Sequence, residues 1–283
     1  MRKQSAGFLF ILPWLIGLVL FTLAPMIAAV YISLTDWTIV GEANFIGFDN
    51  YTHLFQSEEF YKSLWVTVRY ALLAIPLIIA TSLAISVMLD KGHKGVGIFR
   101  VVYYMPAIVS GVAVAIVFKW ILDPNFGLIN SILTFFNIKG PDWLYDPDWV
   151  LPSYLIMAVW GAGGSILTYL AALKDIPQDL YGAAMIDGAG TLQKVRFITV
   201  PMMTPIIFYN LIIGIIGAFR KFTDAYVLGG AGKEGNFIMV YLYEQAFNHY
   251  NMGYATALAW VLFAIILTLT IIVNATKKYW VHT

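Results

Sequence analysis

Residues 63–89 read SLWVTVRYALLAIPLIIATSLAISVML, and Arg69 is the only charged side chain among them. A helix needs about 20 mostly apolar residues to cross the hydrocarbon core of a bilayer. This stretch is long enough, and a run of this length without further charge is typical of a membrane-spanning helix. We therefore expect a transmembrane helix here.

Similar apolar stretches recur on both sides of this one. They cover residues 6–34, 101–122, 149–173, 197–219 and 245–276. The composition agrees, because 60% of the chain is hydrophobic and 12% is charged, whereas a soluble domain carries about 25% charged residues. The sequence predicts an all-α, polytopic membrane protein with six transmembrane helices.

Lysine and arginine predict the orientation, because they are enriched in cytoplasmic loops. With the N-terminus inside, the inner segments hold ten basic and four acidic residues, whereas the outer loops hold five basic and twelve acidic residues. This distribution places both termini in the cytoplasm, with Arg220 and Lys221 as a discordant outer pair. The ten inner basic residues are Arg2, Lys3, Lys91, Lys94, Arg100, Lys174, Lys194, Arg196, Lys277 and Lys278.

Two loops predict local structure. The outer residues 125–133 have apolar spacing that fits a short helix, and the inner residues 174–201 read KDIPQDLYGAAMIDGAGTLQKVRFITVP. In the inner loop, Pro177 suits the first turn of a helix over 178–186. Gly188 can end that helix in the left-handed conformation, and Thr191 can cap a second one. We expect a helical hairpin on the inner face; an ordinary connector is the alternative.

This inner loop resembles the EAA motif of bacterial ABC-importer permeases, which reads Glu-Ala-Ala, two residues, Asp-Gly-Ala, and a later Phe and Pro. Gly182 stands where the motif has Glu. Residues 222–228 and 246–255 are similar to the sugar branch of that family, the relatives of the maltose and glycerol-3-phosphate permeases. The residues that match the motif are Ala183, Ala184, Asp187, Gly188, Ala189, Phe197 and Pro201.

The resemblance implies a type I ABC importer permease fold in the bacterial inner membrane. Residues 1–62 would form an N-terminal helix with the first extracellular loop, residues 63–276 the five-helix permease core, and residues 277–283 a cytoplasmic tail. The residues expected to dock on the ATPase are Ala183, Ala184, Asp187, Gly188 and Ala189.

The resemblance also implies partners and a substrate class. A second permease subunit would complete a heterodimer, and a cytoplasmic ATPase dimer would hold ATP and Mg, so this chain binds no cofactor itself. An extracellular or periplasmic solute-binding protein would deliver a sugar or oligosaccharide.

Small and polar residues in the later stretches are candidates for the substrate path. Amides, hydroxyls and aromatic faces suit a neutral polyhydroxy solute, and polar groups inside a membrane bundle often mark a pathway. For Asn210 an interhelical hydrogen bond is the alternative, and for Gly161, Gly163 and Gly164 it is close helix packing. The candidates are Trp160, Gly164, Ser165, Tyr209 and Asn210.

Several other functions are disfavoured. The run Gly229–Lys233 lacks the first glycine and the final Ser or Thr of a phosphate-binding loop, so we expect no ATPase site on this chain. The chain has no cysteine, and its four histidines are scattered, so we expect no metal site. A net charge of +1 gives no support for nucleic-acid binding. An ion-coupled secondary transporter is the runner-up, but it needs membrane-embedded acids, and the six stretches contain no Asp or Glu.

Overall fold

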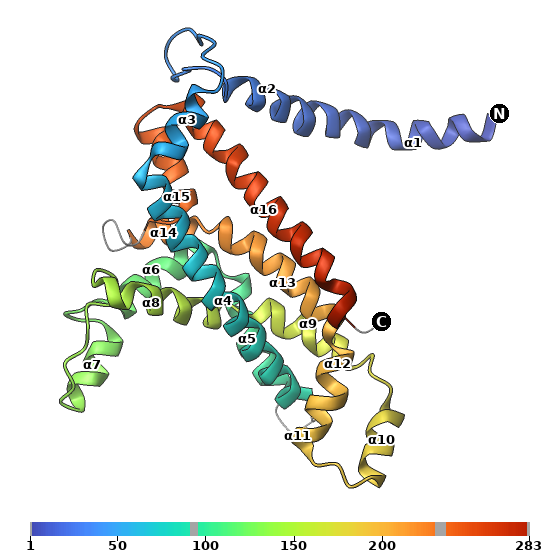
Figure 1. Ribbon diagram of the computed structural model, residues 1–283. Helices are drawn as coiled ribbons and strands as arrows, with labels where there is room; N and C mark the ends of the chain where they lie inside the picture. Colours follow the sequence, from blue (N-terminus) through green and yellow to red (C-terminus); the bar gives the residue numbers. More distant parts are fainter. Residues whose placement is uncertain (1, 91–95, 230–235, 282–283) are drawn as a thin grey trace. The chain divides into compact units, whose positions relative to one another are not determined.

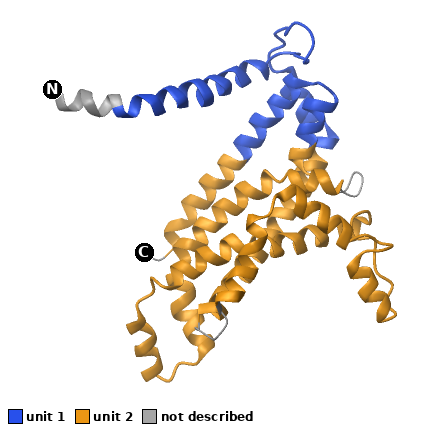
Figure 2. Cartoon of the chain, turned by 180° about the vertical axis from the view of Figure 1, so that it is seen from behind, with its two compact units in different colours: residues 1–60, 241–265 blue, residues 61–240, 266–283 orange. Residues whose placement is uncertain are grey.

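The computed structural model describes residues 2–90, 96–229 and 236–281. Those residues form helices without a β-strand, which confirms the all-α prediction. The chain divides into two compact units, coloured separately in Figure 2: residues 1–60 with 241–265, and residues 61–240 with 266–283. Lys91, Lys94 and the part of the glycine-rich run from 230 to 233 lie outside the described residues.

The first unit contains one long apolar helix and a lobe that follows it. The long helix is irregular near Pro25, which has no N–H to continue the hydrogen-bond ladder, and a π-helical turn precedes it, where the N–H of Ala24 bonds the carbonyl of Val19. The helices of this unit, in part shared with the second, are α1 (Arg2–Leu18), η1 (Val19–Leu23), α2 (Ala24–Ile32), α3 (Asp49–Gln56), α15 (Ile238–Tyr243), η4 (Glu244–Asn248) and α16 (Met252–Trp280).

The second unit holds the remaining helices (Figure 1). The outer loop forms the short helix α7, as its apolar spacing predicts. The helices are α4 (Glu58–Asp90), α5 (Val96–Ile108), α6 (Gly111–Ile121), α7 (Leu128–Phe135), α8 (Pro147–Trp160), α9 (Gly163–Leu173), α10 (Gln178–Ile186), α11 (Thr191–Lys194), η2 (Val195–Thr199), α12 (Val200–Met202), α13 (Thr204–Phe219) and α14 (Thr223–Leu228).

The described helices supply up to six candidate membrane spans. Four are single segments, Phe10–Ser33, Glu58–Asp90, Thr204–Leu228 and Met252–Trp280. The other two are bent pairs, α5 with α6 at 103° and α8 with α9 at 45°.

The prediction of one continuous helix over 101–122 is therefore wrong. Ser110 adopts an extended conformation with ψ 132°, which ends the helical ladder between α5 and α6. Pro106 precedes the break, and proline removes a backbone donor that the ladder would use.

The fifth span also differs from its prediction. We expected residues 197–219, but the candidate span runs from Thr204 to Leu228. Pro205 lies in the first turn of α13, where its missing N–H costs nothing. The candidate span therefore includes Arg220, Lys221 and Asp224, which the predicted stretch leaves outside. The single-segment candidate spans thus include acids that the predicted stretches do not, namely Asp224 here and Glu58, Glu59 and Asp90 at the ends of Glu58–Asp90.

Candidate functional site

The inner loop folds into the expected hairpin, with α10 as one arm and α11, η2 and α12 as the other (Figure 1). Gly188 has φ +75°, a left-handed conformation that side-chain-bearing residues adopt only at a cost. Its N–H bonds the carbonyl of Met185 at 3.1 Å, and the N–H of Ala189 bonds that of Ala184 at 2.8 Å. This pair of bonds is a Schellman motif, which ends the first arm and turns the chain sharply.

The second arm begins differently from the prediction. Gly190 is the N-cap and Thr191 is the first helical residue, so Thr191 does not cap this helix. The side chain of Gln193 reaches back and accepts the N–H of Gly190 at 2.7 Å. A side chain three residues into the helix thus satisfies a donor that the helix leaves free.

The base of the hairpin is fixed to the membrane helices. Ile176, just before α10, belongs to a buried cluster with Tyr169 of α9 and Met203, which joins α12 to α13. Tyr181 of α10 packs against this cluster, and its hydroxyl lies 2.9 Å from Oγ1 of Thr199, either group being able to donate. A displacement of α10 would therefore act directly on two membrane-spanning segments.

The tip of the hairpin is exposed and partly apolar. No residue of α10 is buried, and Ile186 is 88% exposed. Leu192, on the other arm, is 80% exposed. Of the predicted docking residues, Ala183, Asp187 and Gly188 are exposed, and Ala184 and Ala189 are half-buried. Exposed apolar side chains on a segment outside the candidate spans are typical of a protein-binding surface.

The residues predicted for the substrate path fall into two separate groups. Trp160, Gly164 and Ser165 flank the bend between α8 and α9, and the Trp160 ring packs edge-on against Phe118 at 5.3 Å. The other group, on α13, comprises Tyr209 and Asn210. Within the described chain, no hydrogen bond or ring contact is found between the two groups.

Asn210 is satisfied within its own helix. Its side-chain nitrogen donates to the carbonyl of Ile206 at 2.9 Å, one turn earlier. Among the described residues, Asn210 therefore shows no hydrogen bond to another helix. Its carbonyl oxygen has no partner among the described residues, so a role in the substrate path stays a prediction.

Close helix packing occurs at Gly163 rather than at Gly164. A Cβ added to Gly163 would lie 2.0 Å from the carbonyl oxygen of Tyr103, on α5, whereas a Cβ at Gly164 meets nothing within 4 Å. The helices α5 and α9 can approach this closely because Gly163 has no side chain.

Gly163→Val is therefore expected to destabilise the protein by ~1–3 kcal/mol, because the added atoms push on backbone. Thermal unfolding in lipid nanodiscs should show the melting temperature falling by roughly 2–4 °C per kcal/mol. Gly164→Val, one residue along the same helix, is the matched control and should melt like the unaltered protein. Equal melting of the two variants would contradict the close approach.

A polar cavity that sequence reasoning missed lies between α4 and the α13–α14 segment. Its volume is ≈ 390 Å³, within the range of about 300–1,000 Å³ for small-ligand pockets. Tyr70 lines it from α4, and Arg220, Lys221, Thr223 and Asp224 line it from the other side.

An ion pair lines this cavity, and three aromatic rings surround its cation, of which the Tyr70 ring also lines the cavity. The ammonium of Lys221 pairs with the carboxylate of Asp224. The same ammonium lies 4.7 Å from the ring centre of Tyr70, 5.2 Å from that of Tyr154 and 5.8 Å from that of Phe237. Side-chain exposure is 10% for Lys221 and 24% for Asp224. Aromatic faces stabilise a cation that has little water around it, so this charge is held inside the protein.

One sequence signal could have found this site. Arg220 and Lys221 are the pair that disagrees with the predicted orientation, and both lie in the candidate span Thr204–Leu228. A basic residue followed three positions later by an acid can pair on a helical turn. The aromatic partners, in contrast, come from α4, α8 and the segment before α15, and no local pattern brings them together.

Comparisons with known proteins agree with this architecture. A model of the family described as binding-protein-dependent transport system inner membrane component matches residues 77–280. The chain is 40% identical to the probable ABC transporter permease protein YesP of Bacillus subtilis, over 99% of this chain and 93% of that protein. It is 34% identical to the arabinooligosaccharides transport system permease protein AraP of the same species, over 95% and 88%.

A solved structure shows the same fold. A chain of a bacterial ABC transporter involved in the import of the acidic polysaccharide alginate has a TM-score of 0.88, with 24% identity. The match covers 98% of this chain and 96% of that chain. At this identity the likeness concerns the fold alone.

Proposed function

The chain belongs to the family of binding-protein-dependent transport system inner membrane components, and from this premise we propose that it conducts a sugar or oligosaccharide as one permease subunit of an ATP-driven importer. Membership in this family of ABC permeases removes the ion-coupled secondary transporter as an alternative. It also places ATP hydrolysis on a separate subunit, so this chain is not itself an enzyme.

The relatives and the cavity support a sugar as the solute. AraP, which is 34% identical, is named for arabinooligosaccharide transport. The cavity beside Lys221 offers hydroxyl, carboxylate and ammonium groups next to the Tyr70 ring. Such groups can form hydrogen bonds with the hydroxyls of a sugar, while the sugar ring packs on the aromatic side chain. We take this cavity as part of the substrate path.

The hairpin is the observation that carries the coupling mechanism. Its apolar, exposed tip supports docking on a cytoplasmic ATPase dimer that holds ATP and Mg. Its base is fixed through Ile176 and Tyr181 to α9 and the start of α13. Closure of the ATPase dimer would move the tip, and the packed base would transmit that movement to the spans and the cavity between them.

Further partners follow from the same proposal. An extracytoplasmic solute-binding protein would deliver the sugar, and a second permease subunit, forming a heterodimer, would supply the other half of the path. The expected location is the bacterial inner membrane, with both termini in the cytoplasm.

Reconstitution tests the proposal directly. The complex is purified with this chain as bait, placed in liposomes with its binding protein, and given radiolabelled arabinotriose or maltotriose. Uptake of at least one sugar that requires both ATP and the binding protein is the expected result. Uptake that continues without ATP, or a bait that never copurifies with an ATPase, would contradict the proposal.

Gly182→Glu is expected to strengthen the association with the ATPase. A Cβ at Gly182 meets nothing within 4 Å, so the larger residue fits the isolated chain. Replacing a mid-helix glycine gains about 0.8–1 kcal/mol of helix stability, and the glutamate also restores the residue usual in the motif. Gly182→Ala, which brings the helical gain without the carboxylate, is the matched control.

The measurement is the fraction of ATPase retained on the tagged permease after salt washes. Higher retention with Gly182→Glu than with Gly182→Ala would assign the gain to the carboxylate. Lower retention would show that the partner surface has adapted to the glycine.

A further inference from the structure

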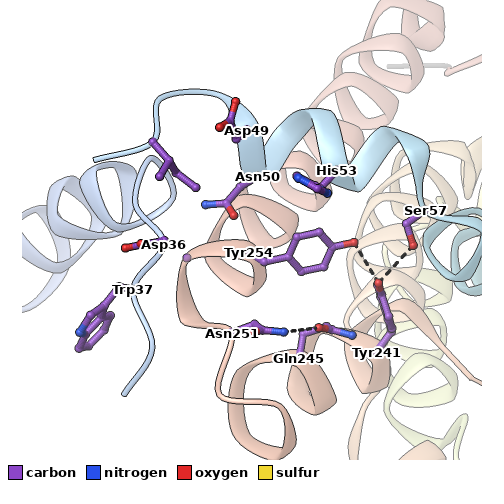
Figure 3. Close-up of a pocket in the computed structure, with 12 residues that line it drawn as sticks. Asp36, Trp37, Asp49, Asn50, His53, Ser57, Tyr241, Gln245, Asn251 and Tyr254 are labelled. Atoms are coloured by element: carbon purple, nitrogen blue, oxygen red, sulfur yellow. Dashed lines mark hydrogen bonds between the residues drawn. The ribbon is translucent and has the colours of Figure 1, made fainter. Parts of the chain in front are cut away.

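A second polar pocket, separate from the cavity beside Lys221, lies within the first unit (Figure 3). Its volume is ≈ 480 Å³. Pockets that bind small ligands have volumes of about 300–1,000 Å³, so this one is large enough for a small ligand. One wall is the loop after the first span together with α3, and the other is η4 with the start of α16. Both walls lie next to the outer ends of spans in the predicted orientation.

Specific hydrogen bonds fix the loop wall and join it to the other wall. The buried side chain of Asn50 donates to the carbonyls of Ser33 at 2.9 Å and Thr35 at 2.8 Å. The N–H of Gly253 bonds the carbonyl of Trp37 at 3.0 Å, linking the first loop to α16. These bonds hold the loop in one conformation, so a ligand would not have to order it.

One end of the pocket is closed by three hydroxyl groups. The hydroxyls of Tyr241 and Tyr254 lie 2.9 Å apart, and that of Tyr241 lies 3.4 Å from Oγ of Ser57 (Figure 3). Tyr241 lies in α15, Tyr254 in α16, and Ser57 just before α4. Hydrogen bonds between these three segments hold this end of the pocket in place.

Several polar groups in the pocket remain available to a ligand. Among the described residues, the indole N–H of Trp37, the ring of His53 and the carboxylate of Asp49 have no hydrogen-bond partner. The carbonyl of Gln245 accepts from Asn251 at 3.3 Å, which leaves the Gln245 amide N–H groups directed at no described residue. These side chains supply both hydrogen-bond donors and acceptors. A sugar presents hydroxyls, which both donate and accept, so such a set can bind it.

The charges of the pocket disfavour an anionic ligand, and its side chains do not form a metal site. Both carboxylate oxygens of Asp36 accept from Asn44, at 2.8 and 3.1 Å, and these bonds hold the pKa of Asp36 below its usual value. No group of three or more metal-ligating side chains occurs in the described chain. Asp36 and Asp49 together would repel an acidic ring. An uncharged, hydroxyl-rich ligand fits best.

We propose that this pocket is an outer saccharide-binding site, which holds an uncharged sugar ring of the transported oligosaccharide before the sugar reaches the membrane path. The inference rests on the proposed sugar import and adds a location and a charge preference to it. His53, Asp49 and Gln245 bind the hydroxyls, and Trp37 lines the pocket from the first loop.

Saturation-transfer NMR on the complete permease–ATPase complex in nanodiscs, without the binding protein, tests this site. The probes are maltotriose and arabinotriose as neutral sugars and trimannuronate as an acidic one. Transfer to a neutral trisaccharide, and at least fivefold less to trimannuronate, is the expected result. Gln245→Ala and Asp49→Asn should each reduce the neutral signal severalfold.

Matched controls are available in the same unit. Gln56→Ala and Glu42→Gln change the same side-chain types at exposed positions outside the pocket, and should leave the signal unchanged. A neutral signal that the pocket variants and the controls affect equally would overturn the proposal, as would a complete lack of signal. ATP-dependent uptake by the unaltered complex would persist in each case, so the importer assignment is tested separately.

Discussion

Replacing Gly188 by valine is expected to abolish most sugar uptake while leaving the permease in the membrane. The left-handed conformation at φ +75° costs an L-residue about 1–2 kcal/mol, and a β-branched side chain tolerates it least. The valine should therefore displace the turn between α10 and α11. Such an energy corresponds to about 5–30-fold in an equilibrium between two conformations, and we expect uptake to fall by a similar factor.

Uptake in proteoliposomes and ATP hydrolysis by the same complex are the measurements. We expect hydrolysis that no longer responds to the loaded binding protein. Gly182→Ala is the control, because it alters the same hairpin at a position without a positive φ. Unaltered uptake in Gly188→Val would remove the hairpin from the coupling mechanism.

Lys221→Met is expected to destabilise the protein by about 3 kcal/mol, because it leaves the carboxylate of Asp224 without its counter-ion. Breaking a buried pair costs about 3–5 kcal/mol, and the 24% exposure of the Asp224 side chain places the cost at the low end. Thermal unfolding in nanodiscs should detect a lower melting temperature. Lys119→Met, at an exposed position of α6, should melt like the unaltered protein.

The double variant Lys221→Met with Asp224→Leu separates stability from transport. Replacing both charges by apolar groups can restore the stability that a single change removes. We expect the double variant to melt like the unaltered protein but to transport poorly, because the cavity has lost both of its charged hydrogen-bonding groups. Normal uptake by a stable double variant would limit the pair to a structural role.

The sequence predicts those features of the fold that depend on nearby residues. The bounds of α10 follow from Pro177 and Gly188, whose backbone preferences act locally. The apolar stretches mark the spans because a bilayer excludes charge. The break at Ser110 was not predicted, since an extended residue between two apolar helices leaves no composition signal.

The sites are less predictable than the fold. A lysine and an aspartate three residues apart look like loop charges until the rings of Tyr70, Tyr154 and Phe237 are placed around them. The pocket in Figure 3 joins Trp37 to Gln245, which lie far apart in the sequence. Thr191 is predicted as a cap, but the helix starts one residue earlier than that prediction, with Gly190 as the N-cap and its N–H donating to the Gln193 side chain.

The contact between the hairpin and the ATPase is the central claim, and site-specific crosslinking tests it most directly. The chain has no cysteine of its own, so a single cysteine at Ile186, which is 88% exposed, can be labelled uniquely with benzophenone-maleimide. A second variant with cysteine at Phe45, which is 66% exposed in the first outer loop, is the control. After irradiation of the intact complex, we predict a permease–ATPase product from position 186 and none from position 45. Absence of that product at 186, or equal yield at 45, would contradict the account.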